Sequence, residues 1–401
     1  MRRGVLLLLL LVPHAVAAEG SRMITMEEAL RRAGEMAPAA RAVGFRVERA
    51  RAEARAMGLW ANPEVSLSRE ESAGTVERFS NLSLAIPLWG RLGQERAAGR
   101  SGLAAVVASA DQEGVALRAA VRAAFIDLLR AQEQVQGLES GRGRLAELVR
   151  VLRAREQEGE SSGFDRMRAE RALAEVEADR LEARASMASA RATLGALVAL
   201  PSEVLEASGS LAASSALLPL EDARSLALSR GDLRALDAEA EQADHLATAA
   251  RRRRVPEPTV TAGTKTTETG GDGDSGPVVA IAFALPLFDR GQSARVARSE
   301  ADLLRARRQA LALEVDAEVT AAHAVAAARR EAEAAYFGAP DSEEMVRIAR
   351  AAYETGEMRI FELLDACRTA LEVRLRGISL QAEARQAEVA LVRAIGQEVG
   401  R

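Results

Sequence analysis

Few residues in this chain could carry covalent or metal chemistry. Cys367 is the single cysteine, and the three histidines, His14, His245 and His323, lie far apart in the sequence. A nucleophilic site needs a base within hydrogen-bond reach of the nucleophile, and a zinc site needs ligands at short, regular spacings. Neither pattern occurs here. The sequence therefore predicts no enzyme, no cofactor, no metal site and no internal disulfide.

Two carboxylates near the C-terminus have a spacing that could act on ions. Glu362 and Asp365 are three residues apart in a helical segment, so both lie on one helix face. From the residues alone, the pair is interpreted as part of a solvated helix face, since a chain rich in Arg and Glu contains many such pairs.

The composition is typical of long helices and coiled coils. Apolar residues make up 48% of the 401 residues but aromatic residues only 3%, so the apolar content is mainly Ala, Leu and Val. The net charge of −4 becomes −6 without the first 18 residues, which carry two Arg and no acid. This mild acidity predicts no nucleic-acid binding. The one basic run, four Arg at residues 251–254, is interpreted as charge capping at a helix end.

Residues 1–18, MRRGVLLLLLLVPHAVAA, have the pattern of a secretory signal peptide. Arg2 and Arg3 precede an apolar core, and a small-residue cleavage site follows it. The apolar run is far shorter than the ~20 residues that a membrane-spanning helix needs. No Cys follows the cleavage site, so we expect no lipid anchor there. The chain is expected to leave the cytoplasm.

The remaining sequence contains an internal duplication. LAIPLWGRLGQ from residue 84 recurs as FALPLFDRGQ from residue 283, and GESSGFD from residue 159 is matched by GEMRIFE from residue 356. Helical segments from residues 26 and 220 each have a break near the middle, at Pro38 and Gly231. Because the blocks keep one order and a nearly constant offset, we predict two repeats, residues 19–208 and 209–401. A linker rich in Ser and Ala is expected at residues 201–219.

Each repeat is expected to contain a helix, a β-hairpin and two long helices. The predicted strands are residues 62–70, 79–87, 257–267 and 277–287, and the predicted long helices are residues 94–158, 164–199, 292–338 and 359–397. A heptad seam in the first long helix predicts coiled-coil packing. Its positions are Leu117, Val121, Ala124, Leu128, Ala131, Val135 and Leu138. Gly137, Gly141 and Gly143 are expected to interrupt this helix or to bend it softly, and the Gly-Ala-Pro at residues 338–340 is expected to break its counterpart.

The predicted strands alternate in character. Leu82, Leu84 and Ile86 alternate with small or polar residues, as do Val279 and Ile281 in the second hairpin. This pattern suits a barrel with lipid outside and a lumen inside. The alternative is a soluble sheet whose two hairpins pair within the chain and pack one face on helices. Two hairpins alone leave open edges that lipid does not tolerate, so insertion would require several chains.

The duplicated plan, the Pro-ended strands and the stretch YETGEMRIFELLDACRTALEVRLRG from Tyr353 resemble the TolC-like outer-membrane efflux protein family. The likeness covers essentially the whole mature chain. It implies a mainly α fold with a small β part, in which a homotrimer closes one β-barrel above an α-helical periplasmic tunnel. The implied location is the outer membrane, extending into the periplasm. The implied partners are a periplasmic adaptor, an inner-membrane pump and outer-membrane lipid, with no nucleic acid.

The resemblance also gives places to residues. Glu362 and Asp365 match the acidic pair at the narrow inner end of the tunnel, which implies a pore constriction. Met358 stands where the family pattern carries Arg, which puts a closed-state latch in doubt although Arg359 is adjacent. The helix turns imply an adaptor-docking tip, with an ordinary glycine-capped turn as the alternative. The tip residues are Gly159, Phe164, Tyr353, Gly356, Arg359 and Phe361.

The junction between barrel and tunnel would lie at the repeated strand ends, Pro87, Trp89, Pro286 and Phe288. Together with Trp60, these aromatic residues could form an interfacial belt or pack as a core. Proline cannot donate to a strand ladder, so pairing is expected to end at the rim.

The implied function is passive conduction of small toxic solutes, drugs or metal ions, out of the cell. A type I protein-secretion duct shares the architecture, but the short chain and brief loops are closer to metal- and drug-efflux members. A candidate of another class is a soluble periplasmic coiled-coil adaptor or scaffold, which should carry more than the four strands found here. Cargo and pump family stay open in the sequence.

Overall fold

The computed structural model describes residues 22–159, 162–202, 205–212, 216–339 and 342–397, so the predicted signal peptide and Pro340 lie outside the described residues. The chain divides into two compact units. Unit 1 comprises Met1–Arg32, Ala124–Leu211 and Asp341–Ile378, and unit 2 comprises Ala33–Ala123, Ala212–Pro340 and Ser379–Arg401. Each unit takes segments from both predicted repeats. The division into repeats concerns the sequence and stays a prediction.

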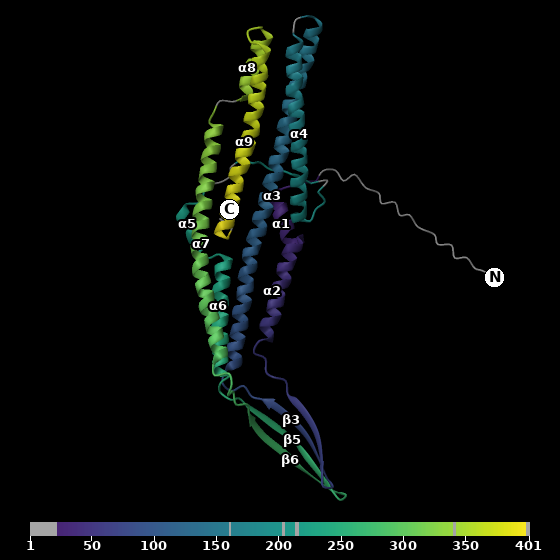
Figure 1. Ribbon diagram of the computed structural model, residues 1–401, viewed down its shortest axis with the longest axis vertical. Helices are drawn as coiled ribbons and strands as arrows, with labels where there is room; N and C mark the ends of the chain where they lie inside the picture. Colours follow the sequence, from purple (N-terminus) through teal and green to yellow (C-terminus); the bar gives the residue numbers. More distant parts are fainter. Residues whose placement is uncertain (1–21, 160–161, 203–204, 213–215, 340–341, 398–401) are drawn as a thin grey trace, which may run out of the picture. The chain divides into compact units, whose positions relative to one another are not determined.

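The elements are mainly helical (Figure 1). The helices are α1 (Met26–Met36), α2 (Pro38–Ala56), α3 (Arg91–Gln157), α4 (Gly163–Val198), α5 (Leu220–Ala227), α6 (Gly231–Arg252), α7 (Gln292–Phe337), α8 (Ser342–Glu354) and α9 (Ile360–Ile395). The strands are β1 (Arg22–Ile24), β2 (Glu64–Ser72), β3 (Thr75–Ala85), β4 (Leu205–Ala207), β5 (Pro258–Thr269) and β6 (Asp272–Phe283). Across the described residues, no helix combines the length and the apolar character needed to cross a membrane.

Unit 2 contains a four-stranded antiparallel sheet in the order β2-β3-β5-β6. The register places Val65 opposite Leu82, Leu82 opposite Ala262, and Ala262 opposite Val279. Directly opposite residues of an antiparallel sheet point to the same face. One face is therefore apolar across all four strands, as the alternation predicted.

The apolar face of the sheet is open. Leu67 is 76% exposed, and Val279 and Ile281 are exposed as well. The hairpins do pair within the chain, as the soluble alternative expects. The soluble alternative also requires helices to pack on the apolar face. The side chains of this face are exposed, which contradicts that requirement.

The helix breaks follow from proline and from close backbone approach. Pro38 stands at the first position of α2, where a missing N–H costs nothing, so α1 ends before it. At the matching break, α6 begins at Gly231, where a Cβ atom would lie 2.3 Å from the carbonyl oxygen of Ala108. Both breaks were predicted.

Helix α3 runs without interruption from residue 91 to residue 157, as the predicted helix 94–158 requires, so an interruption at its three glycines is wrong. The alternative of a softer bend there stays a prediction. A Cβ atom at Gly141 would lie 2.9 Å from Leu371 Cδ2, and one at Gly137 would lie 3.4 Å from Leu375 Cδ2. These two glycines therefore let α3 approach α9 closely. All positions of the predicted seam are buried except Leu117, which is half-buried.

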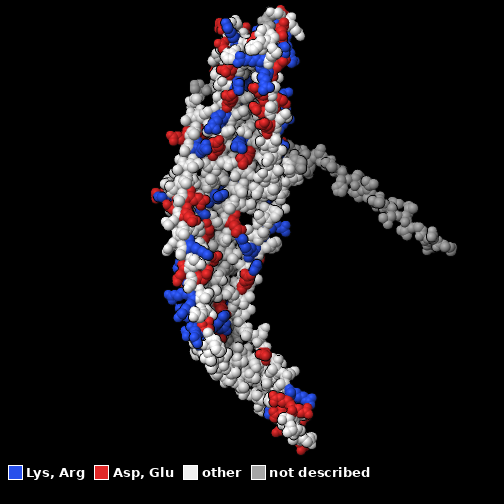
Figure 2. Space-filling view, in the orientation of Figure 1, with Lys and Arg blue, Asp and Glu red and all other residues white. Residues whose placement is uncertain are grey.

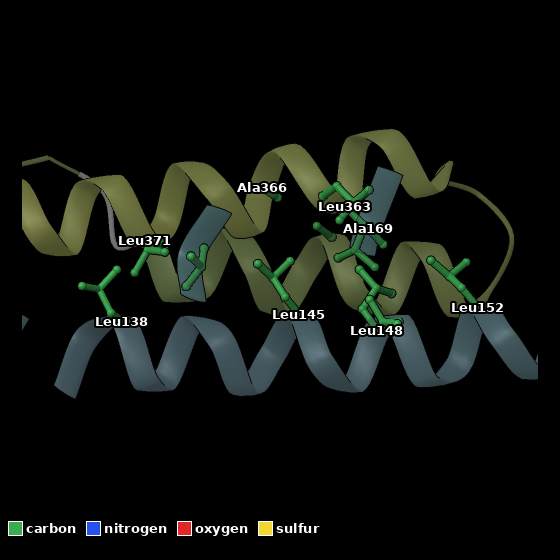
Figure 3. Close-up of a cluster of buried hydrophobic side chains, with 12 residues drawn as sticks. Leu138, Leu145, Leu148, Leu152, Ala169, Leu363, Ala366 and Leu371 are labelled. Atoms are coloured by element: carbon green, nitrogen blue, oxygen red, sulfur yellow. The ribbon is translucent and has the colours of Figure 1, made fainter. Parts of the chain in front are cut away.

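The core of unit 1 lies where α3, α4, α8 and α9 meet. Figure 3 shows leucines of α3 pointing toward residues of α9. The buried cluster is Leu138, Leu145, Leu148, Val149, Leu152, Ala169, Val176, Ala349, Leu363, Leu364, Ala366 and Leu371.

A small parallel sheet of unit 1 was not predicted. Strand β1 pairs with β4, and Ile24 lies opposite Ala207. Strand β4 lies inside the region, residues 201–219, that was expected to be a linker. The side chain of Gln132 on α3 holds β4 by accepting from Ala207 N at 2.9 Å and donating to Ala207 O at 3.3 Å.

Candidate functional sites

The first strand-to-helix joint of unit 2 is held by an ionic network. Arg91, the first residue of α3, donates to Glu95 at 2.9 Å and to Glu257 at 3.0 Å, and Arg253 donates to Glu95 at 2.7 Å. Burial of Glu95 opposes its ionisation, but the hydrogen bonds and charges of both arginines outweigh burial and lower the pKa of Glu95. The network ties the start of α3 to the end of α6 and the start of β5.

The predicted junction residues lie around this network. Strand β3 ends at Ala85 and β6 at Phe283, two and three residues before Pro87 and Pro286 respectively. Trp89 is 48% exposed and its indole N–H donates to Pro256 O at 3.1 Å, while Phe288 is 93% exposed. Such exposure rules out core packing for Phe288 within the chain.

The second joint is built differently. Arg290 adopts a left-handed φ of 45° and Gly291, the N-cap of α7, a φ of 85°. The Asp289 carboxylate accepts from the Ser293 backbone N–H at 3.1 Å and from its hydroxyl at 2.7 Å, and these bonds lower the pKa of Asp289. Side-chain capping of this kind fixes the first turn of α7.

The arginine run at residues 251–254 serves both joints, which sequence reasoning missed. Arg252 donates to Gly90 O at 2.7 Å, and Arg254 Nη1 would lie 3.4 Å from a Cβ atom at Gly291. Capping of α6 describes only part of its role, because the run also reaches the two repeated glycine turns. The repeated motif could have indicated this role, because it marked two similar strand-to-helix joints that the arginine run could contact.

The predicted tip residues of unit 1 lie at two helix turns. Gly159 and Gly356 have φ values of 80° and 79°, so each turn needs the left-handed conformation that glycine adopts readily. Phe164 at the first turn and Phe361 at the second are exposed. A glycine-capped turn is therefore present at both places, and adaptor docking remains a proposal.

Two arginines join the turns within unit 1. Arg155 donates to the Tyr353 hydroxyl at 3.2 Å and its guanidinium lies 5.1 Å from the centre of that ring. Arg168 lies 4.1 Å from the centre of the Phe361 ring. Cations over aromatic faces stabilise such contacts by roughly 0.5–2 kcal/mol. Neither arginine was singled out from the sequence.

The acidic pair lies in the first two turns of α9. The Glu362 carboxylate accepts from the backbone N–H of Arg359 at 2.8 Å, which is a capping-box contact at the start of the helix. Asp365 lines a cavity of about 190 Å³ together with Phe361, Arg168 and Cys367. Both carboxylates are exposed, whereas Met358 packs against the core of unit 1 and Arg359 is exposed.

The two histidines that the structure describes both have polar partners. His245 Nδ1 lies 2.9 Å from Gln94 Oε1, and His323 Nε2 donates to Leu218 O at 2.9 Å. Burial raises the pKa of the Cys367 thiol. Over the described ranges, no group of three or more His, Cys, Asp or Glu residues is placed to hold a metal ion.

Comparison with known proteins identifies a matching family and a sequence relative. A family model described as "Outer membrane efflux protein" matches residues 29–200 and 223–397. The cobalt-zinc-cadmium resistance protein CzcC of Cupriavidus metallidurans is 28% identical over 354 residues, which cover 84% of this chain and 81% of CzcC.

Two solved structures illustrate the shared fold. Crystal structures of CusC match with a TM-score of 0.75 at 18% identity, covering 93% of this chain and 92% of CusC. The open state of the Neisseria gonorrhoeae MtrE outer membrane channel matches with a TM-score of 0.73 at 21% identity, covering 93% of this chain and 89% of MtrE. The family match spans most of the chain in two segments, and the fold agrees with it. The chain therefore belongs to the outer membrane efflux protein family of TolC-like channels, and it is a non-enzymatic efflux channel of the outer membrane with a helical extension into the periplasm.

Proposed function

We propose that the chain is the exit duct of a tripartite efflux system. In this proposal a homotrimer passively conducts small toxic solutes, drugs or metal ions, that an inner-membrane pump delivers through a periplasmic adaptor. Channels of this family are trimeric parts of such systems. The observation that carries the proposal is the sheet of unit 2.

This sheet has the properties of one part of a shared barrel. Its outer strands, β2 and β6, each have one edge that no described strand covers. Lipid does not tolerate unpaired strand edges, and a closed barrel needs about eight strands or more. Three copies would supply twelve strands, an even number of the kind that outer-membrane barrels contain. The exposed apolar face would meet lipid, and the polar face would line the lumen.

The opposite face of the sheet is suited to water. Ser83 and Thr261 share a hydrogen bond of 2.8 Å, and Lys265, the only lysine of the chain, pairs with Glu77 at 2.7 Å. A face of hydroxyls and paired charges supports its assignment to a solvent-filled lumen.

Metal ions are the cargo to test first. The 28% identical relative is named a cobalt-zinc-cadmium resistance protein and covers most of this chain. A passive duct needs no tight metal site of its own, because the pump supplies selection and energy. Drug efflux remains within the proposal, since solute transport through a lumen depends on pore size and charge.

The acidic pair and the tip have proposed roles in this duct. Glu362 and Asp365 are exposed on successive turns of α9, so three chains around an axis would present rings of negative charge. The exposed Phe164 and Phe361 at the turns would contact the adaptor. We propose these residues as the pore constriction and part of the docking tip.

A matched pair of substitutions tests insertion of the sheet. Leu67 and Ser68 are neighbours on edge strand β2, both exposed, and point to opposite faces. Leu67→Arg should reduce the membrane oligomer, because Arg on a lipid face costs about 2–4 kcal/mol at the bilayer midplane. Ser68→Arg should leave the oligomer intact, since the lumen solvates charge. Equal behaviour of the two variants would contradict a lipid-facing Leu67.

Cargo is tested in cells that lack the chain. Loss of the chain should lower the tolerated concentrations of cobalt, zinc and cadmium, and the Ser68→Arg variant, but not the Leu67→Arg variant, should restore them. Restored tolerance to a drug panel without any change in metal tolerance would assign drugs as cargo. Loss of a secreted protein with unchanged tolerance to metals and drugs would favour a protein-secretion duct instead.

A further inference from the structure

Four consecutive arginines, residues 251–254, lie at the end of unit 2 where strands meet helices. Two of them are committed to protein partners, because Arg252 donates to Gly90 O and Arg253 to Glu95 Oε1, each at 2.7 Å. Among the described residues, the Arg251 side chain donates to the hydroxyl of Thr248 alone, at 2.8 Å. The Arg254 guanidinium has no hydrogen bond or ion pair among the described residues, although its charge acts weakly on Asp289. Arg251 and Arg254 are thus exposed cations that form no ion pair with a carboxylate in the described part of the chain.

Arg290 adds a third exposed cation at the same place. It precedes Gly291, and a Cβ atom on that glycine would lie 3.4 Å from the Arg254 guanidinium. Its φ of 45° is a conformation that costs a non-glycine residue roughly 1–2 kcal/mol. Strain of this kind concentrates at functional positions. The described part of the chain contains no carboxylate paired with Arg290.

The surroundings of these cations are apolar on the side of the sheet. Phe288 is 93% exposed, and Leu285, Leu287 and Trp89 are exposed too. Within unit 2, Figure 2 shows basic side chains gathered near the end of α6 and the start of α7, and a nearly uncharged band over the adjoining part of the sheet. Exposed aromatic residues between a basic cluster and an apolar band are typical of the water–lipid interface.

We propose that Arg251, Arg254 and Arg290 bind the phosphate groups of anionic phospholipids in the periplasmic leaflet of the outer membrane. The inference rests on the membrane insertion of the sheet proposed above. A guanidinium matches a phosphate with paired, charge-assisted hydrogen bonds. Charge complementarity selects this occupant, since none of the three cations forms an ion pair with a carboxylate of the described chain. Because Arg252 and Arg253 fasten the same run to the α3 joint, bound lipid would also brace the barrel against the helices.

The chain supplies its own probe for this site. Its two tryptophans are Trp60 and Trp89, both exposed, and Trp89 donates to Pro256 O, two residues beyond Arg254. The full chain is reconstituted in vesicles in which either phosphatidylglycerol or phosphatidylcholine, at equal mole fraction, is brominated near the head group. Bromine quenches tryptophan on contact, so the ratio of the two quenching levels reports which lipid lies beside the joint.

The wild type should show a local preference for phosphatidylglycerol of about fivefold, equivalent to ~1 kcal/mol for one arginine near an anionic surface. The triple variant Arg251→Gln, Arg254→Gln, Arg290→Gln should lose it. A matched control is Arg41→Gln, Arg307→Gln, Arg393→Gln, three exposed arginines of the helices, likewise unpaired among the described residues, that carry the same charge change. The control should keep the preference.

Several results would overturn the inference. Equal quenching by both lipids in the wild type would mean that another copy of the chain covers the run. If the triple variant kept the preference, the phosphatidylglycerol site would lie elsewhere on the protein. If the control variant lost the preference equally, the preference would come from the overall charge of the protein. Loss of the preference on adding millimolar inorganic phosphate at constant ionic strength would show a free-anion site rather than a lipid site. Conductance of the same vesicles keeps the proposed function separate: a conducting protein without lipid preference contradicts this inference alone.

Discussion

Three glycines of α3 predict different responses to the same substitution. Alanine in place of glycine inside a helix stabilises by about 1 kcal/mol. Gly143 has no atom within 4 Å of an added Cβ, so Gly143→Ala should give the full gain. At Gly141 the added Cβ would lie 2.9 and 3.1 Å from the two terminal methyl carbons of Leu371, a buried side chain of α9.

The contact at Gly141 should cancel or reverse the stabilisation that the alanine gives. Overpacking a core typically costs 1–3 kcal/mol, which cancels or exceeds the gain in helix propensity. We therefore expect Gly141→Ala to be less stable than Gly143→Ala by roughly 1–3 kcal/mol. Thermal unfolding of the purified protein, followed by circular dichroism at one scan rate, should show Tm values about 2 °C apart for each kcal/mol.

A double-mutant cycle assigns the effect to Leu371. Leu371→Ala alone should cost about 2–5 kcal/mol, because it empties part of the core. In the Gly141→Ala background the same truncation should cost about 1–3 kcal/mol less, because the new methyl group fills part of the space. Equal Tm shifts for Gly141→Ala and Gly143→Ala would refute the close packing of α3 on α9.

Three further predictions concern charge and the tip. Glu362→Gln combined with Asp365→Asn should weaken cation block in planar bilayers, and unchanged currents would assign both residues to a solvated face. The pKa of Glu95 is lowered in the folded chain, so its stabilisation is full above the ordinary carboxyl pKa of ~4.3 and is lost as pH falls through the lowered value. Glu95→Gln should therefore remove part of the fall in Tm on acidification, and an identical pH profile would contradict this. Tyr353→Phe loses the bond from Arg155, about 1 kcal/mol, and should speed proteolysis at the tip, whereas equal cleavage would show that the ring contact suffices.

Local pattern predicted most of the elements. Alternation in β3 and β6 indicated one apolar face, and the strand register confirms it through Leu82, Ala262 and Val279. The heptad seam of α3 and the helix break at Pro38 were likewise readable, because both depend on neighbouring residues. The predicted strand 79–87 begins at Thr75 and ends at Ala85, a difference confined to the ends.

Features that depend on distant partners were not predictable from one sequence. Gly141 looks like a helix break until Leu371 of another helix is placed beside it. Strand β4 has three residues, and its partner β1 is far away in the chain, so no periodicity marks it. The arginine run is explained locally as positive charge at the C-terminus of α6. Its contact with Gly90, in contrast, depends on how the two joints fold.

The arginine contacts also change the meaning of the repeated motif. Both copies end strands before a helix, and the single run at residues 251–254 reaches a glycine in each. One copy is secured by Arg91 and Glu95, the other by the bonds that the Asp289 carboxylate accepts from Ser293. The two joints are therefore held by different chemistry despite their similar sequence.

Single-channel recording tests whether copies of this chain form one conducting barrel. The purified full-chain oligomer is added to a planar lipid bilayer, with the Leu67→Arg protein as the control. The wild type should give stable, ohmic channels, and Leu67→Arg should give fewer channels for the same amount of protein. A wild-type protein that remains a soluble monomer and gives no conductance steps would contradict it.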